Sequence, residues 1–319
     1  MSKLPAAVSL LCALCVSAER LPAAASPAPI RVLTFNILAS QPSWEVNAKR
    51  DVWEKRRPVA VGLMLRPAGG AYDFIGTQET ATHDRPELHQ ARQLAAGMTG
   101  YGSLYAPCDG PSHESKFSLT NMIFWRKDRW EIDAKEQGTF WLSDTPEIPG
   151  SNTWSPVDEK TGKRTNKGGR RNVTWGLFHE IADGRRTGRR VYFFNTHLNV
   201  FVPAARAKSA FLILGRIHGR ADKTAPIILT GDFNSKRDSL VYQYLTGSAV
   251  DFEGGRRTPP LALAEAFAAA NPDAAYKPPI DFIFASEGLK AASARVIDVA
   301  RGSVQPSDHR PVEGVLEWR

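Results

Sequence analysis

Cysteine is scarce in this chain of 319 residues, which has three, at positions 12, 15 and 108. Two of them lie in an N-terminal segment typical of an export signal: Lys3 precedes the apolar run 6–16, and small residues follow at 17 and 18. We therefore expect a signal peptide over residues 1–18, with cleavage as late as residue 25 as an alternative, and a buried N-terminal helix as a third reading. Cleavage leaves Cys108 as a free thiol, which excludes an internal disulfide in the mature chain.

Long hydrophobic runs are also missing after this segment, so no later stretch could span a bilayer as a helix. Acidic residues are outnumbered, since 41 Lys and Arg face 33 Asp and Glu for a formal net charge of +8. This surplus weakly favours an anionic partner such as nucleic acid, a phosphate ester or an acidic membrane surface. The signal peptide predicts a secreted or periplasmic protein, and the lack of long apolar runs predicts that it has no transmembrane segment. We take the protein to be a monomer.

Short β-rich runs and helical patterns interleave after a linker over residues 19–29. Strands are expected at Ile30–Phe35, Tyr72–Thr77, Met122–Trp125, Val173–Phe178, Val191–Thr196, Ile227–Thr230, Ile280–Ala285 and Pro311–Trp318. Helices are expected at Asp51–Leu65, Pro86–Met98, Pro203–His218 and Ser239–Leu245, and Pro156–Arg171 should be an exposed basic loop. The region from 100 to 200 looks mainly β, which predicts sheets packed on sheets with helices outside, in one domain over residues 30–319.

Polar residues stand at or just after the ends of several expected strands, where a rigid sheet can hold side chains in a pocket. Asn36 follows the first strand, and Glu79 lies two residues after another, where its carboxylate could bind a hard cation such as Mg²⁺. His197 ends a third strand and could contact a phosphoryl oxygen, shuttle a proton or bind metal. Asp232 and Asn234 share one face of an extended segment, which suits positioning of water and substrate together.

A carboxylate and an imidazole are adjacent at Asp308 and His309, and Asp281 begins another strand. An Asp that fixes the tautomer of a His acting as a base is a known catalytic arrangement. Each of these residues alone is more often structural, because polar groups are commonly satisfied by their neighbours.

Six segments, in this order, resemble the successive signatures of the endonuclease/exonuclease/phosphatase superfamily. They are Thr34–Leu38, Gln78–Glu79, Asn195–Leu198, Gly231–Asn234, Ile280–Phe284 and Ser307–Val312. Gly138–Ser143, Trp154 and Val173–Trp175 further resemble the bacterial metal-dependent hydrolase branch of this superfamily. The resemblance runs from about residue 30 to 319 and implies a DNase I-like four-layered α/β sandwich, with two packed, mainly antiparallel β-sheets flanked by helices.

The resemblance also implies roles for individual residues. Asn36, Glu79 and Asp308 would hold Mg²⁺ or Mn²⁺, with Glu79 as the principal ligand. The catalytic residues would be His197, Asp232, Asn234, Asp281 and His309, with His309 and Asp281 acting as a pair. Arg171 and Asn199 would bind substrate, although Arg171 could equally be one more solvated residue of the basic loop. Some relatives pair the counterpart of His197 with a Glu for which this sequence offers no clear equivalent.

These observations together predict an exported metal-dependent phosphoesterase, most simply a phosphodiesterase, with nucleic acid as the leading substrate class. Phospholipid or sphingomyelin headgroups and small sugar phosphates are alternatives, and a non-catalytic anion-binding protein with the same fold is another. The basic loop before Arg171 is expected to hold polyanionic substrate.

Overall fold

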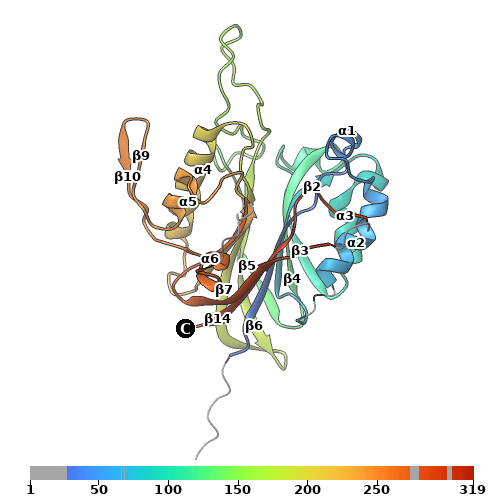
Figure 1. Ribbon diagram of the computed structural model, residues 1–319, viewed down its shortest axis with the longest axis vertical. Coiled ribbons are helices and arrows are strands. Elements are labelled where there is room, and N and C mark those ends of the chain that lie inside the picture. Colours follow the sequence, from blue (N-terminus) through green and yellow to red (C-terminus); the bar gives the residue numbers. More distant parts are fainter. Residues whose placement is uncertain (1–26, 66, 68, 274–279, 300–303) are drawn as a thin grey trace, which may run out of the picture.

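The computed structural model describes residues 27–65, 67, 69–273, 280–299 and 304–319. Within them, two six-stranded sheets pack against each other, and helices cover their outer faces (Figure 1). This confirms the predicted α/β sandwich. The expected signal peptide and residues 19–26 of the expected linker lie outside the described residues.

The first sheet contains both the first and the last strand of the described chain. Its strands are β1 (Ile30–Asn36), β2 (Phe74–Thr82), β3 (Tyr101–Leu104), β4 (Ser118–Arg126), β13 (Leu289–Val296) and β14 (Val312–Trp318). Their order is β13-β14-β1-β2-β4-β3, with β1 and β2 parallel and the other neighbours antiparallel.

The second sheet has the same plan, with one parallel pair at its centre. Its strands are β5 (Trp130–Trp141), β6 (Asn172–Ala182), β7 (Arg185–His197), β8 (Ile227–Asp232), β11 (Ala264–Glu265) and β12 (Asp281–Ala285). Their order is β11-β12-β8-β7-β6-β5, and β7 and β8 are parallel. Two parallel pairs therefore lie at the middle of the molecule, which brings the carboxyl ends of four strands to a common region.

Three hydrophobic clusters hold these layers together. Helices α1 (Pro42–Asn47), α2 (Trp53–Leu65) and α3 (Gln90–Gly97) lie beside the first sheet, where α2 and α3 share a core with β1 and β2. Helices α4 (Pro203–Gly219) and α5 (Leu240–Leu245) cover the second sheet. The third cluster joins Phe74 of the first sheet to Phe193 of the second, and α6 (Ala266–Ala270) packs at its margin.

Smaller elements complete the fold. Short 3-10 turns cover Pro86–Leu88 and Pro111–His113, and a separate hairpin joins β9 (Val250–Phe252) to β10 (Gly255–Arg257). The expected helix over Pro86–Met98 is divided into a 3-10 turn and α3, because His89 lies between them and its Nδ1 accepts from the backbone N–H of Arg92. Ser239 caps α5 in a similar way, since its Oγ accepts from the backbone N–H of Tyr242.

All eight expected strands and all four expected helical regions are present, although several differ in length. The strand expected at Tyr72–Thr77 continues to Thr82, because pairing with β4 resumes at Thr80 after a register shift that leaves Gln78 and Glu79 without partners in β4. β5, β3 and β13 were not expected, since their sequences are rich in polar residues or alanine.

A buried polar layer ties the two sheets together beneath the strand ends. The Asn195 side-chain amide of β7 donates to the carbonyls of Thr77 and Met122, and its Oδ1 accepts from Gln78 and Thr230. Gly76 lies against this layer, where a Cβ would come within 2.6 Å of Asn195 Oδ1. The register of one sheet on the other is thus fixed by hydrogen bonds as well as by apolar packing.

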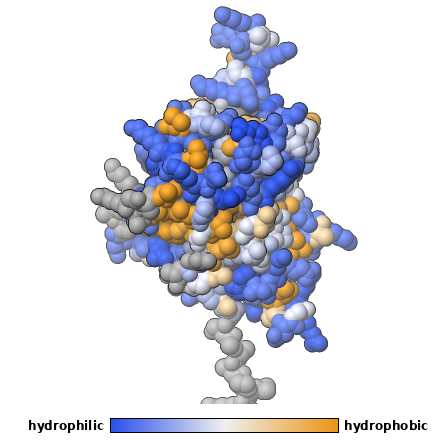
Figure 2. Space-filling model, turned by 90° about the vertical axis from the view of Figure 1, so that its right-hand side faces the viewer, coloured by the Kyte–Doolittle hydropathy of each residue, from blue (hydrophilic) through white to orange (hydrophobic). Residues whose placement is uncertain are grey.

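In the part of the chain that the structure describes, no helix is long and apolar enough to cross a membrane. The face that carries α2 and α3 is largely hydrophilic, with hydrophobic residues gathered at mid-height (Figure 2). The segment between β5 and β6, which includes the expected basic loop, rises above the sandwich (Figure 1). A bridge between Val157 and Arg164 makes part of it hairpin-like.

Candidate active site

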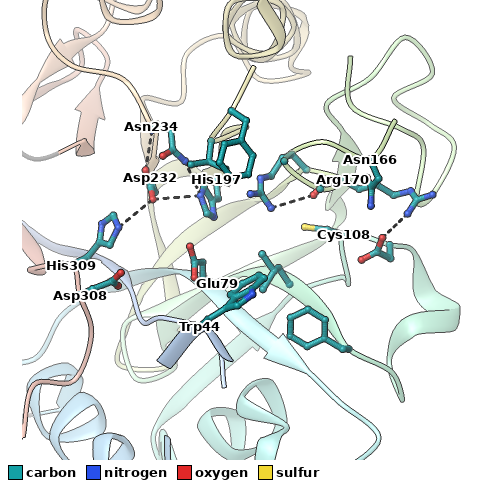
Figure 3. A pocket seen from close by; sticks show the side chains of 18 residues that line it. Trp44, Glu79, Cys108, Asn166, Arg170, His197, Asp232, Asn234, Asp308 and His309 are labelled. Atoms are coloured by element: carbon teal, nitrogen blue, oxygen red, sulfur yellow. Dashed lines mark hydrogen bonds and ion pairs between the residues drawn. The ribbon is translucent and has the colours of Figure 1, made fainter. Parts of the chain in front are cut away.

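The ends of β1, β2, β7 and β8 meet at one end of the sandwich. There the side chains of Glu79, His197, Asp232 and His309 surround a common space (Figure 3). One group of potential metal-binding atoms comes from Glu79, His197 and Asp232, and all three atoms lie within 4.8 Å of one another. Residues from both sheets are needed to build this cluster.

Glu79 reaches the cluster because its backbone is left-handed, with φ of 54° at the irregularity in β2. A non-glycine residue adopts such a conformation at a cost, and these conformations concentrate at functional sites. The carboxylate accepts from Asn36 Nδ2 at 3.1 Å and from the backbone N–H of Ala39 at 3.4 Å. These two contacts leave acceptor capacity that faces the cavity.

Asn36 bridges carboxylates from the two sheets. Its Nδ2 also donates to Asp232 Oδ2 at 3.0 Å, and its Oδ1 accepts from the backbone N–H of Leu38 at 3.1 Å. The amide therefore presents its nitrogen, not its oxygen, to Glu79 and Asp232.

Asp232, Asn234 and His197 form a second connected group. The backbone N–H of Asn234 donates to Asp232 Oδ1 at 2.9 Å, and Asn234 Nδ2 lies 2.9 Å from His197 Nε2. Asn234 is itself left-handed, with φ of 46°. His197 Nε2 is also 3.4 Å from Asp232 Oδ2, while its buried Nδ1 has no hydrogen-bond partner. The structure thus supplies contacts for His197 that the sequence did not identify.

His309 and Asp281 are in contact as expected, since His309 Nδ1 donates to Asp281 Oδ2 at 2.8 Å. The other ring nitrogen of His309, Nε2, is 3.8 Å from Asp232 Oδ2. Asp308 is exposed and lines the same cavity, with one oxygen accepting from Ser307 Oγ at 3.3 Å. A second group of metal-binding atoms within 4.8 Å of one another comes from Asp232, Asp281 and His309.

These contacts displace the protonation equilibria of three residues. Burial, and then the neighbouring Asp281 carboxylate, raise the pKa of Asp232 to about 7. Burial also lowers the pKa of His197 well below its ordinary value, with the positive charge of Arg171 as the next cause. For His309, burial opposes the charged form, but the carboxylates of Asp281, Asp232 and Asp308 outweigh it and raise the pKa to about 10. At neutral pH the site therefore holds one neutral and one protonated imidazole.

Arg171 and Asn199 occupy different positions relative to the cavity. Arg171 lines it just before β6 and is buried, with 5% of its surface exposed. Its guanidinium has no carboxylate within ion-pair distance among the described residues, and its Nε has no partner. Asn199 does not line the cavity, because its amide is used internally: it accepts from the N–H groups of Phe201 and Val202 and donates to the carbonyl of Lys167.

The cavity measures about 630 Å³ and extends well beyond the polar cluster. Its further lining was not predicted from the sequence and includes Trp44, Phe117, Asn166, Arg170 and Phe201. Trp44, Phe117 and Phe201 carry no motif and come from α1, from the approach to β4 and from the loop after β7, so no local pattern in the sequence connects them.

The donor set suits a hard divalent cation. Mg²⁺ and Mn²⁺ prefer carboxylate and carbonyl oxygens, which Glu79, Asp308 and Asp232 supply around the cavity. Asn36 could contribute its oxygen only if its amide rotated and gave up the contact to Leu38. Cys108 also lines the cavity, but its thiol belongs to neither group of potential metal-binding atoms found among the described residues.

Comparison with known proteins assigns the family. Residues 33–309 match the Endonuclease/Exonuclease/phosphatase family, and the chain belongs to it. The structure is similar to an endonuclease/exonuclease/phosphatase from Bacteroides vulgatus, with 24% identity, a TM-score of 0.70, and coverage of 92% of this chain and 100% of that one. No curated protein matches this chain.

Two further solved structures extend the comparison. A Bacteroides thetaiotaomicron mannosyl-6-phosphatase is 25% identical, with a TM-score of 0.65 and coverage of 91% of this chain and all of that one. The human Nocturnin catalytic domain with bound sulfate is 19% identical, with a TM-score of 0.62 and coverage of 92% and 96%. The fold of this chain is therefore that of the family's phosphoesterases.

Proposed function

We propose that this protein is an exported, metal-dependent phosphodiesterase. The observation that carries the proposal is Arg171, a buried guanidinium on the cavity wall with no carboxylate partner among the described residues. A buried unpaired charge is costly, so a protein keeps one where a ligand will neutralise it. The planar fork of Arg binds two oxygens of a phosphate at once, and the adjacent acidic cluster is suited to a cation that shares this phosphate.

Glu79, Asp308 and, after rotation of its amide, Asn36 would hold Mg²⁺ or Mn²⁺. When bound, such an ion polarises a phosphoryl oxygen and offsets charge on the leaving oxygen. The same ion would neutralise the carboxylates that the protein concentrates at this end of the sandwich.

The protein's own groups would position and deprotonate water. Asp232, whose pKa is raised to about 7, accepts the proton of a water that attacks phosphorus as the bond to the leaving oxygen breaks. Asn234 fixes Asp232 and His197 through the hydrogen bonds described above. His309, kept protonated by Asp281, stabilises negative charge on the phosphoryl group, and Arg171 holds that group in place.

Nucleic acid is the leading substrate class in this proposal, on the strength of the positive charge and the basic segment above the cavity. A small sugar phosphate is the second candidate, because one similar structure is a mannosyl-6-phosphatase. Export rests on residues 1–18, and sequencing of the mature N-terminus from culture medium or periplasm would test it.

The deciding experiment is hydrolysis by purified mature protein with Mg²⁺, with Mn²⁺ and with EDTA. The substrates are DNA, RNA, sphingomyelin, bis-p-nitrophenyl phosphate, p-nitrophenyl phosphate and mannose 6-phosphate. Metal-dependent cleavage that falls by about 10²–10⁴-fold in Asp232→Ala supports the proposal. The exposed residue Glu317 on β14 gives the matched control, Glu317→Gln, which should keep full activity.

Glu79→Ala separates catalysis from binding. If the protein only binds anions, Glu79→Ala should retain the affinity for the ligand, and neither the wild type nor the variant should hydrolyse the substrate. A folded wild-type protein that is inactive on every ester, with either metal, would contradict the proposed activity.

A further inference from the structure

Beside its polar cluster, the cavity has walls that a phosphate group alone does not need. Trp44, Phe117 and Leu119 line it from the side of the first sheet, and Val200 and Phe201 line it from the loop after β7. Trp44 lies near Glu79, whereas Asn166 and Arg170 lie on the side of the cavity away from His309 (Figure 3). Aromatic and aliphatic side chains therefore share this cavity with its charged groups.

Two of these aromatic residues are unusually exposed. Trp44 and Phe201 have 38% and 63% of their surface exposed, and among the described residues no other aromatic side chain is classed as exposed. Trp44 is held edge-on against Phe117, with ring centroids 5.6 Å apart. Isolated exposed apolar residues are ordinary on protein surfaces, but a cluster of them beside one pocket marks a ligand surface.

The chemistry of the surrounding groups limits what this ligand is. Arg171 provides the unpaired cation for a phosphate, and Arg170 is already paired with Asp109 at 2.7 Å. The exposed amide of Asn166, which also lines the cavity, makes no hydrogen bond to another described residue and offers both a donor and an acceptor. A phosphate-binding arginine, aromatic side chains and an amide in one cavity are complementary to a phosphate ester that carries a planar heterocycle with hydrogen-bonding edges.

We propose that the aromatic side chains lining this cavity, Trp44, Phe117 and Phe201, bind the nucleobase attached to the reacting phosphate. This rests on the proposed phosphodiesterase function and narrows its substrate to a nucleotidyl ester with an unstacked base. Bases stack on aromatic side chains in single-stranded nucleic acids, whereas a duplex keeps its bases paired inside. The volume of about 630 Å³ lies within the range of pockets that enclose small ligands.

The test compares two substrates with the same leaving group, the p-nitrophenyl ester of thymidine 5′-monophosphate and methyl p-nitrophenyl phosphate. We expect wild-type KM to be lower for the nucleoside ester by on the order of tenfold, the scale of one base stacked on an aromatic ring. Phe201→Ala and Trp44→Ala should raise KM for the nucleoside ester much more than KM for the methyl ester, and so remove most of this difference. Ile148→Ala, at an exposed apolar residue that does not line the cavity, is the matched control.

A binding measurement separates this inference from the proposed activity. Calorimetry should show that wild-type protein prefers thymidine 5′-monophosphate to ribose 5-phosphate, and that Phe201→Ala loses the preference. If neither ester is hydrolysed, the proposed activity is wrong. The preference for thymidine 5′-monophosphate over ribose 5-phosphate would still show whether the base site exists. Equal affinities for the two ligands would overturn the base site, even in an active enzyme.

A lipid chain is the competing occupant of an apolar wall, and Phe201→Leu distinguishes it. Leucine keeps apolar surface but lacks an aromatic face, so we expect the variant to lose nucleotide preference as Phe201→Ala does. Tighter binding of monomeric dihexanoyl phosphatidylcholine than of the nucleotide, retained in Phe201→Leu, would overturn the proposal in favour of lipid.

Discussion

Arg171 shows how one residue can be unfavourable for stability and still be retained. Its guanidinium is removed from water, and the described protein offers no anion in return. The charge of Arg171 also acts on His197, because after burial it is the next cause that lowers the pKa of that imidazole and keeps it neutral. A residue that served packing alone would be replaced by an apolar side chain without loss.

This reasoning gives opposite expectations for stability and for substrate binding. In Arg171→Met, the free energy of unfolding should be unchanged or higher by about 1 kcal/mol, because a buried unpaired charge is removed. KM for a phosphodiester should rise by about tenfold or more, since a charge-assisted contact is lost. Urea denaturation and steady-state kinetics check both, and a strongly destabilised variant would show that Arg171 has a structural role.

The pair of His309 and Asp281 predicts a pH dependence. The folded-state pKa of about 10 for His309 lies above the ordinary 6.5, so the paired imidazolium stabilises the fold fully below about pH 6.5. That stabilisation is lost as the pH rises through 10. In metal-free Asp281→Asn, the His309 titration should move down by about 1–3 pH units, the usual effect of removing one neighbouring charge.

NMR of the imidazole protons would measure this shift, with His218 on α4 as an internal reference outside the site. The stability difference between wild type and Asp281→Asn should be largest a little below pH 6.5, where Asp281 is ionised and His309 is protonated, and should shrink as the pH approaches 10. A His309 that titrates near pH 6.5 in both proteins would contradict the interpretation of this pair.

Several site residues could be predicted because they follow buried strands in short motifs. Asn36, His197 and Asp232 end β1, β7 and β8, so predicting the strands also placed these residues. Trp44 and Phe201 could not be predicted, because exposure is set by distant packing and an isolated aromatic residue in a sequence carries no such information. Asn199 was expected to bind substrate, but the folded loop uses its amide as an internal cap.

At the scale of elements, one arginine of α2 joins the segments that carry the site. Arg56 is fully buried and donates to the carbonyls of Ile37, Leu38 and Pro306 at 2.7, 3.1 and 2.8 Å. It also forms an ion pair of 2.6 Å with Glu45 of α1. The end of β1, helix α1 and the segment before Asp308 are therefore positioned from one side chain.

Loss of this arginine should be severe. We expect Arg56→Met to lower the free energy of unfolding by about 3–5 kcal/mol, because Glu45 becomes an uncompensated buried charge. The double variant Arg56→Met with Glu45→Gln should recover part of the loss. Chemical denaturation of the wild type, the two single variants and the double variant gives the coupling energy between Arg56 and Glu45. A coupling energy near zero would show that this ion pair does not contribute to stability.

The basic segment between β5 and β6 should affect the binding of long substrates and not of short ones. Replacing Lys160, Lys163 and Lys167 with Gln should raise KM for DNA and flatten its dependence on salt, since fewer counterions are displaced. KM for bis-p-nitrophenyl phosphate should not change, because this small ester reaches only the cavity. Arg164 is left in place because it donates to the carbonyl of Ser155 and braces the segment. Unchanged salt dependence for DNA would show that the lysines are only solvated.

Elements with clear hydrophobic periodicity were predicted well, and those shaped by tertiary contacts were not. β5 pairs with β6 over most of its length although its sequence is mostly polar, because it lies at the edge of the second sheet. The irregularity in β2 that exposes Glu79 could not be predicted either, since it depends on pairing with β4.

At the scale of the whole molecule, the site exists only where two sheets meet. Asn36 and Glu79 come from the first sheet, and His197 and Asp232 come from the second. Concentrating carboxylates at this boundary opposes folding unless a cation is bound. The family resemblance implied two packed sheets, but the order of the strands could not be predicted, because periodicity in the sequence indicates strands and not their neighbours.

Metal binding should therefore stabilise the whole protein. Mn²⁺ at about 100 times its dissociation constant is expected to raise the free energy of unfolding by about 2.7 kcal/mol, by mass action. Glu79→Ala should lose most of this effect, whereas Glu317→Gln should retain it. Thermal denaturation with and without EDTA measures the difference, and equal stabilisation of both variants would place the metal elsewhere.

The position of β14 has a consequence for folding kinetics. This strand lies between β13 and β1, and its residues Val312–Leu316 pair with Ile30–Thr34, which lie far from them in the sequence. The entropy of closing such a long loop must be lost before these contacts can stabilise the sheet. The first sheet should therefore close late in folding, and until then the unpaired edge of β1 is open to association with other chains.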